Sequence, residues 1–187
     1  MAPSFSWSAP NSGKTLLVKN LLVRQQKPFE EIYVIHCDSG YTKEYDDVDA
    51  TMLTEIPAPE EWEGQVKTLV VLDDLEFKTM NKDQRRHLDR LFGYVSTHKN
   101  ISVVLCSQDP FNVPPIVRRC SNLWILWRMN DIDAMATVAR KSGLKAGQLK
   151  EIFDELMSDP KDSLWIDMTD NSPYPLRKNG FTLIEME

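Results

Sequence analysis

The chain has 187 residues, 42% of them hydrophobic, and a formal net charge of −6, values typical of one soluble globular domain spanning 1–187. No apolar run approaches the roughly 18 residues that a membrane helix needs, and no secretion signal opens the chain. We therefore expect an intracellular protein without a membrane partner. The acidic balance indicates that any contact with nucleic acid is local or is built by several subunits together.

Strand-like and helical patterns alternate along the chain, which predicts an α/β fold with a mainly parallel central sheet. A strand over 4–7 precedes a helix from 14 to about 26, and β-branched and aromatic residues predict a strand over 32–37. Residues 38–66 contain two acidic clusters, two prolines and little periodicity. We interpret them as a long excursion on the rim of the sheet.

The rest of the chain continues the alternation. Continuous apolar runs predict three buried strands, at 68–74, 101–106 and 122–127. Apolar residues at i, i+3, i+4 and i+7 predict three helices, around 88–95, 132–139 and 149–156. Two more strand candidates follow, at 163–168 and 181–186, and Asn179-Gly180 before the last one predicts a C-terminal β-hairpin.

The stretch SAPNSGKT (8–15) nearly matches the phosphate-binding pattern G-x-x-x-x-G-K-[ST], with Ser8 at its first position. A predicted strand before it and a helix after it supply the context that such a loop requires. We predict that six residues bind the phosphates of ATP: Pro10, Asn11, Ser12, Gly13, Lys14 and Thr15. Lys14 would reach the β- and γ-phosphates, and the Thr15 hydroxyl would bind Mg²⁺. The alternative is an ordinary capped helix start.

Two of the apolar strands end in polar side chains that suit phosphate chemistry. Asp73 follows the run VVL and is placed to hold Mg²⁺ through water, whereas Asp74 would polarise the attacking water. Gln108 follows the strand over 101–106 and would sense the γ-phosphate or the water. The alternatives are carboxylates that cap the next turn and an ordinary loop glutamine.

Two groups of basic residues remain. Arg118 and Arg119 lie in a polar break between two apolar strands, where one of them could neutralise transition-state charge, in cis or on a neighbouring subunit. A second cluster follows the acidic pair and could contact a DNA backbone: Lys78, Lys82, Arg85 and Arg86. For both groups, the alternative is a solvated surface.

Together, four stretches resemble the genome-packaging ATPases of double-jelly-roll DNA viruses: SAPNSGKT, LVVLDDL, SVVLCSQDPFNVPPIVRRCSNLWIL and YPLRKNGF. These proteins form the poxvirus-type, virophage- and Polinton-like branch of the FtsK–HerA superfamily. The resemblance implies a three-layer P-loop NTPase fold with an extra strand between the phosphate-loop strand and the Walker B strand. It also implies a homo-oligomeric ring that uses ATP and Mg²⁺ to push double-stranded DNA into a capsid, with viral capsid proteins as partners.

The resemblance assigns the predicted residues to known roles. Lys14 and Thr15 match the Walker A pair, and Asp73 and Asp74 match the Walker B acids. Gln108 matches the strand-end sensor, and Arg118 or Arg119 matches the trans-acting arginine. The expected location is the host-cell cytoplasm or virus factory, with transient presence at the procapsid.

Two departures from the family pattern concern the catalytic centre. Ser8 replaces the first loop glycine, and Asp74 stands where the wider superfamily usually has glutamate, so Glu76 is a candidate to share its role.

Two other functions use the same phosphate-binding loop. A nucleotide or small-molecule kinase needs a lid with several arginines, but the excursion over 38–66 has no arginine and carries only Lys43 as a basic residue. A non-hydrolysing nucleotide-binding scaffold is the other.

Overall fold

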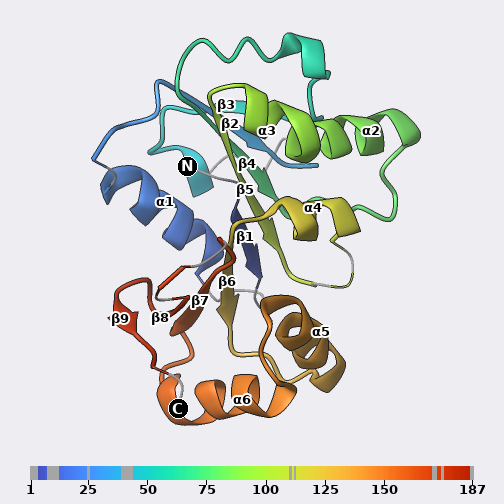
Figure 1. The fold of residues 1–187 in the computed structure, drawn as a ribbon. Helices are drawn as coiled ribbons and strands as arrows, with labels where there is room; N and C mark the ends of the chain where they lie inside the picture. The colour runs from blue at the N-terminus through green and yellow to red at the C-terminus, as the bar shows by residue number, and fades with distance from the viewer. Residues whose placement is uncertain are drawn as a thin grey trace.

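The computed structural model of the chain describes residues 4–7, 13–24, 26–38, 44–109, 111, 113–169, 172–173 and 175–185, with the backbone alone at 4–7. The described residues form one mixed sheet flanked by helices on both faces (Figure 1). None of their helices combines the length and the apolar character that crossing a bilayer requires.

The sheet has nine strands in the order β3-β2-β4-β5-β1-β6-β7-β8-β9. Their bounds are β1 (Ser4–Trp7), β2 (Glu31–Ile35), β3 (Thr51–Leu53), β4 (Thr68–Asp73), β5 (Ile101–Ser107), β6 (Leu123–Trp127), β7 (Ser163–Asp167), β8 (Leu176–Lys178) and β9 (Thr182–Leu183). Strands from β3 to β6 are parallel to their neighbours, and β7 to β9 pair antiparallel. Because β5 lies between β1 and β4, the predicted extra strand is confirmed.

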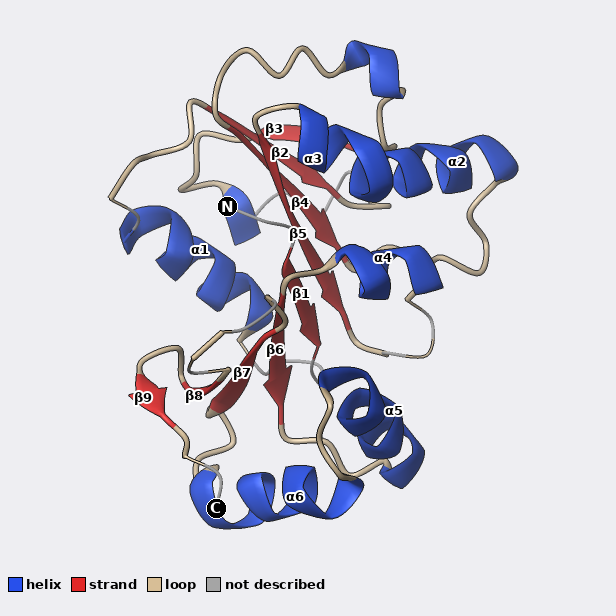
Figure 2. Cartoon of the chain, viewed as in Figure 1, coloured by secondary structure: helices blue, strands red, loops and turns tan. Residues whose placement is uncertain are grey.

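Helical segments connect the strands (Figure 2). They are α1 (Lys14–Arg24), η2 (Pro59–Glu61), α2 (Lys82–Arg90), η3 (Leu91–Val95), α3 (Ser96–His98), α4 (Pro115–Cys120), α5 (Ile132–Ser142), α6 (Ala146–Glu151) and η4 (Ile152–Leu156). The segments α2, η3 and α3 follow one another without a break, as do α6 and η4. Asn81 caps α2 by accepting from the Gln84 N–H at 2.9 Å, and Gly143 ends α5 with a φ of 76°.

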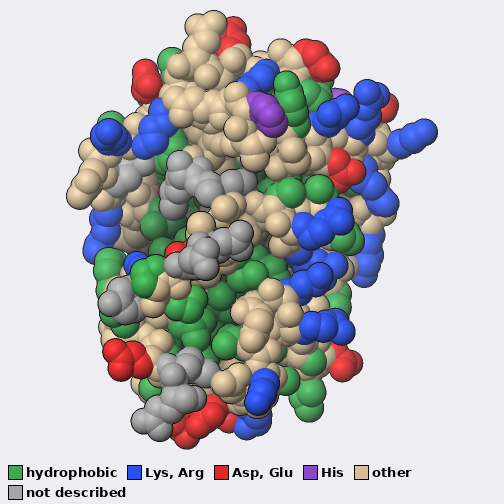
Figure 3. Space-filling view, viewed as in Figure 1, with side chains coloured by type: hydrophobic (Ala, Val, Ile, Leu, Met, Phe, Trp, Pro, Cys, Tyr) green, Lys and Arg blue, Asp and Glu red, His purple; other side chains and the backbone are tan. Residues whose placement is uncertain are grey.

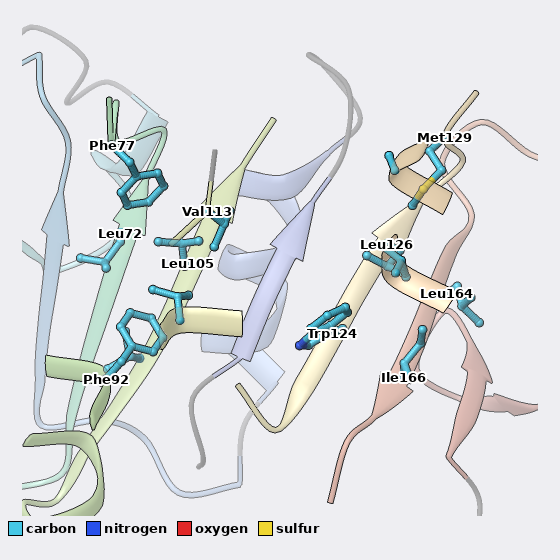
Figure 4. Packing of buried hydrophobic residues seen from close by; sticks show 14 of the residues in the cluster. Leu72, Phe77, Phe92, Leu105, Val113, Trp124, Leu126, Met129, Leu164 and Ile166 are labelled. Carbon is cyan, nitrogen blue, oxygen red and sulfur yellow. The ribbon is translucent and has the colours of Figure 1, made fainter. Parts of the chain in front are cut away.

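Both faces of the central strands are buried, so successive residues of one strand enter different cores. On β4, Val70 and Leu72 pack into the larger core, whereas Leu69 and Val71 pack into the smaller one. Figure 4 shows part of the larger core, which lies on the face covered by α2 and α4 to α6. The smaller core lies beneath α1, so the three-layer arrangement is confirmed.

Most predicted elements are present. Strand ends mostly shift by one or two residues, whereas the helices predicted around 88–95, 132–139 and 149–156 are longer and cover 82–98, 132–142 and 146–156. The C-terminal hairpin is confirmed: β8 and β9 pair antiparallel around Asn179 and Gly180, whose φ values of 52° and 79° are those of a type I′ turn. The last strand is shorter than the predicted 181–186.

Three local predictions need correction. The excursion over 38–66 contains a strand, β3, which extends the parallel sheet beside β2. Arg118 and Arg119 lie in a short helix, α4, because two consecutive prolines, Pro114 and Pro115, start a helical turn there. The strand β8 was not predicted, since its three residues carry no apolar run and obtain their pairing from β7.

Candidate active site

Parallel pairing brings the ends of β4 and β5 to one edge of the sheet. Asp73, the last residue of β4, pairs with Cys106 of β5, and the Asp74 N–H donates to the Cys106 carbonyl at 3.2 Å. β1 ends beside β5 at the same edge, with Trp7 in register with Ser107. The phosphate-loop segment follows β1, so the topology places it next to the predicted acidic residues.

The start of α1 lies close to Asp73. Gly13 has a φ of 100°, a conformation that suits glycine, and α1 begins at the next residue. Lys14 is only 8% exposed, and its positive charge lowers the pKa of the Asp73 carboxyl. The first part of the loop falls outside the described residues, including Ser8 and the predicted phosphate contacts Pro10, Asn11 and Ser12.

Asp73 is the buried carboxylate of the site, at 3% exposure. It accepts a hydrogen bond from the Tyr45 hydroxyl at 2.7 Å. Burial raises the pKa of the Asp73 carboxyl and the nearby Asp74 charge adds to the rise, whereas the Tyr45 hydrogen bond and the charges of His36 and Lys14 lower it. A cation beside this carboxylate would favour its ionised form.

Asp74 occupies a left-handed backbone conformation with a φ of 50°. This region is uncommon for residues other than glycine, although Asp adopts it more readily than most, and such backbones concentrate at functional sites. The Gln108 side-chain amide donates to the Asp74 carboxylate, so the two predicted partners are in direct contact. Both line a hollow of about 220 Å³ that Glu76 and Ser107 also line. Glu76 therefore lies at the same hollow as Asp74.

Two residues of the site were not predicted. Tyr45, from the excursion, hydrogen-bonds both Asp73 and the side chain of Thr15. His36 follows β2 at the same edge and is buried, and its Nδ1 accepts from the Asp38 N–H at 3.0 Å. His36 could have been predicted from the sequence because it stands at a strand end, as the predicted acids and the glutamine do. No sequence pattern marks Tyr45.

The oxygen groups of the site fit Mg²⁺. The Thr15 hydroxyl and the Asp73 carboxylate are linked through one hydroxyl, that of Tyr45. Among the described residues, no three His, Cys, Asp or Glu side chains group into a metal cage. Mg²⁺ rarely uses such a cage and is usually held by one or two protein oxygens, water and substrate phosphates.

The two predicted arginines lie apart from this cluster. They belong to α4, on the opposite face of the sheet from α1 (Figure 1). Arg119 is exposed, whereas Arg118 is half-buried, and its Nε has no hydrogen-bond partner. Within the described ranges, neither arginine makes a hydrogen bond or ion pair with the acidic residues of the site. The structure therefore brings together Lys14 and Thr15 with the acids and Gln108, but not the arginines.

Solved structures share this architecture. The genome packaging NTPase B204 from Sulfolobus turreted icosahedral virus 2, in complex with sulfate, matches with a TM-score of 0.69 and 12% identity over 99% of this chain and 98% of that chain. The same protein in complex with AMPPCP matches with a TM-score of 0.67 and 13% identity, over 95% and 96% of the two chains. The chain has the P-loop NTPase fold.

More distant P-loop NTPases match as well. The pCW3 conjugation coupling protein TcpA, with ATPγS, matches with a TM-score of 0.60 and 16% identity over 90% of this chain and 58% of that chain. No protein-family model matches the chain, and neither does any curated protein sequence. The resemblance to packaging ATPases is thus confirmed at the level of the fold.

Proposed function

We propose that the chain is an ATP-hydrolysing motor that moves double-stranded DNA into a viral capsid. One observation carries the proposal: Lys14, Thr15 and Asp73 gather at the same sheet edge as the hydrogen-bonded pair Asp74 and Gln108. This is the set of groups that phosphoryl transfer to water requires. B204, a DNA-packaging ATPase with the same fold, supports the choice of DNA as the molecule that the motor moves.

The chain's own residues would divide the work of hydrolysis. Lys14 holds the β- and γ-phosphates, and Asp74 accepts a hydrogen bond from the attacking water and orients it in line with the γ-phosphate. Gln108, through its bond to Asp74, fixes the direction of that carboxylate. Thr15 and Asp73 would hold Mg²⁺, which would neutralise part of the phosphate charge when bound.

The proposal includes a homo-oligomeric ring. Since the arginines of α4 do not reach the acids of their own chain, an arginine from a neighbouring subunit would complete each site, and the exposed Arg119 is better placed than Arg118. Viral capsid proteins are the proposed partners of the ring, in the host-cell cytoplasm or virus factory.

The charge distribution supports a local DNA contact on an acidic protein. Residues 76–150 contain thirteen Lys and Arg against six Asp and Glu, whereas residues 1–75 contain six against thirteen. Basic side chains gather on the side of the molecule formed by α2, α4 and α5 (Figure 3). On that side, four exposed residues form no ion pair with any described residue: Lys78, Lys82, Arg85 and Arg86. We infer that this face contacts phosphates.

Removing two of these charges should weaken duplex binding. In the double variant Lys82→Ala/Arg86→Ala, we expect affinity for a labelled DNA duplex to fall roughly tenfold or more. The negative slope of log affinity against log salt should become shallower by about 2. Fluorescence anisotropy over a salt series measures both. Arg24→Ala/Lys27→Ala removes the same charge at the end of α1 and just after it, and should bind like the wild type. Equal losses in the two variants would contradict a local contact.

The packing of the excursion argues against the kinase function. A kinase lid opens and closes over its substrate, whereas Tyr45, Ile56 and Trp62 of the excursion are buried against the sheet. The Gln84 side chain also fastens it to α2, accepting from the Ile56 N–H at 2.7 Å and donating to the Ile56 carbonyl at 3.1 Å. Residues 44–66 are therefore packed into the domain rather than forming a lid.

The Lys14→Ala variant tests the proposed function directly. We expect DNA to stimulate steady-state ATP hydrolysis by the wild type, and Lys14→Ala to reduce the rate at least 100-fold, because the charge that holds the γ-phosphate is lost. Thermal unfolding shows whether the variant is folded. Wild-type turnover in Lys14→Ala, or phosphate transfer to a nucleoside with no effect of DNA, would overturn the proposal.

A further inference from the structure

The Tyr45 hydroxyl lies between the two groups that are proposed to hold the metal. It donates to Asp73 Oδ2 at 2.7 Å, and the Thr15 side chain hydrogen-bonds to it as well. Tyr45 is 2% exposed and Asp73 is 3% exposed, so little water competes for these bonds. One side chain from the excursion therefore connects the start of α1 with the end of β4.

The protein holds the Tyr45 ring in a fixed position. The ring packs into the smaller core, together with Val18 of α1 and Val71 of β4. Burial, followed by the charge of Asp73, strongly raises the pKa of its hydroxyl, which therefore stays a donor. Because buried rings in packed cores keep one rotamer, the hydroxyl cannot swing away without opening that core.

The helix α1 also fastens the turn that carries Tyr45. Lys19 of α1 donates to the Glu44 carbonyl at 2.9 Å and forms an ion pair with Asp47 at 2.5 Å, on either side of Tyr45. The turn is closed by the Val48 N–H, which donates to the Tyr45 carbonyl at 2.8 Å. The helix that begins with Lys14 and Thr15 thus positions the tyrosine that bonds to Thr15.

We propose that Tyr45 is a positioning residue for the metal site, which orients the Asp73 carboxylate and the Thr15 hydroxyl. The inference rests on the proposed function, since it adds Tyr45 to the proposed metal site. Tyr45 lies outside both the phosphate loop and the strand ends that supply the other residues of that site. With Oδ2 of Asp73 engaged by Tyr45, the other oxygen is left to accept from water in the metal's shell. Hydrogen bonds that orient metal-binding groups commonly change metal affinity 10- to 100-fold.

The variant Tyr45→Phe removes the hydroxyl and keeps the packed ring. The experiment titrates MgCl₂ into protein with a fluorescent ADP analogue (mant-ADP) and follows nucleotide affinity, so hydrolysis is not needed. We expect the Mg²⁺ concentration at half-effect to rise about tenfold. Affinity for mant-ADP in EDTA should stay within about twofold, because the phosphate-binding groups are untouched. A matched control is Tyr33→Phe on β2. The ring of Tyr33 meets that of Trp62 edge-on, and this variant should behave like the wild type.

The remaining outcomes separate the inference from the proposed function. An unchanged Mg²⁺ midpoint in Tyr45→Phe would overturn the positioning role. A lower midpoint would also overturn it, because it would mean that the Tyr45 hydroxyl competes with the metal for Asp73. Equal losses with and without Mg²⁺ would mean that the tyrosine only supports the fold. Wild-type protein without any Mg²⁺-dependent gain would overturn both proposals. Lys19→Met, which loosens the turn, should shift the midpoint in the same direction by a smaller factor.

Discussion

The Asp74→Asn variant should lose ATP turnover by about 10²- to 10⁴-fold while its affinity for nucleotide stays within about twofold of the wild type. Asn has the shape of Asp and tolerates the left-handed backbone that Asp74 adopts at a φ of 50°, so the fold is expected to be unchanged. What disappears is the negative charge that would accept the proton of the attacking water. Phosphate release at steady state and equilibrium binding of mant-ADP measure the two quantities separately.

The neighbouring Glu76 provides the matched control. It lines the same hollow as Asp74, but it is exposed and the Gln108 amide bonds to Asp74 instead. The variant Glu76→Gln should therefore lower turnover by less than tenfold, as expected for an auxiliary acid. Equal turnover in the wild type and Asp74→Asn would identify the chain as a nucleotide-binding scaffold that does not hydrolyse ATP.

Most of the fold could be predicted because its signals are local. Strands β4 and β5 are apolar on both faces, and each face has its own core, so the continuous apolar run is a direct consequence of their position. The acids after β4 and the glutamine after β5 could be paired in advance because parallel strands bring their carboxyl ends to one edge. The Asp74–Gln108 bond bears out that reasoning.

The features that escaped prediction depend on contacts between distant segments. The strand β3 has three residues and exists because β2 offers it an unpaired edge. Tyr45 reaches Asp73 only because the excursion folds back beneath α1, held there by Lys19. No spacing or composition in a single sequence encodes such a contact. The difference between Arg118 and Arg119 likewise appears only once α4 sets which side chain faces outward.

Mixed rings of Lys14→Ala and Arg119→Ala subunits should regain activity that neither variant has alone. A trans-acting arginine is worth about 10³- to 10⁵-fold in rate, so Arg119→Ala by itself should be nearly inactive. In a ring assembled from equal amounts of the two variants, about one interface in four pairs an intact Lys14 with an intact Arg119 from the neighbour, so recovery should approach a quarter of the wild-type rate. Co-expression, followed by steady-state phosphate release, measures this recovery.

The control mixture decides whether the arginine acts between subunits. Lys14 and Asp74 lie at the same sheet edge of one chain, so mixing Lys14→Ala with Asp74→Asn leaves every site with one defect and should restore nothing. Recovery in the first mixture and none in the second assigns Arg119 to the neighbouring site. If Arg119→Ala were inactive alone and its mixture with Lys14→Ala regained no activity, the arginine would act within its own chain, and α4 would have to move toward Asp74 during turnover. If Arg118→Ala showed the complementation instead, the half-buried guanidinium would be the one that turns outward at the subunit interface.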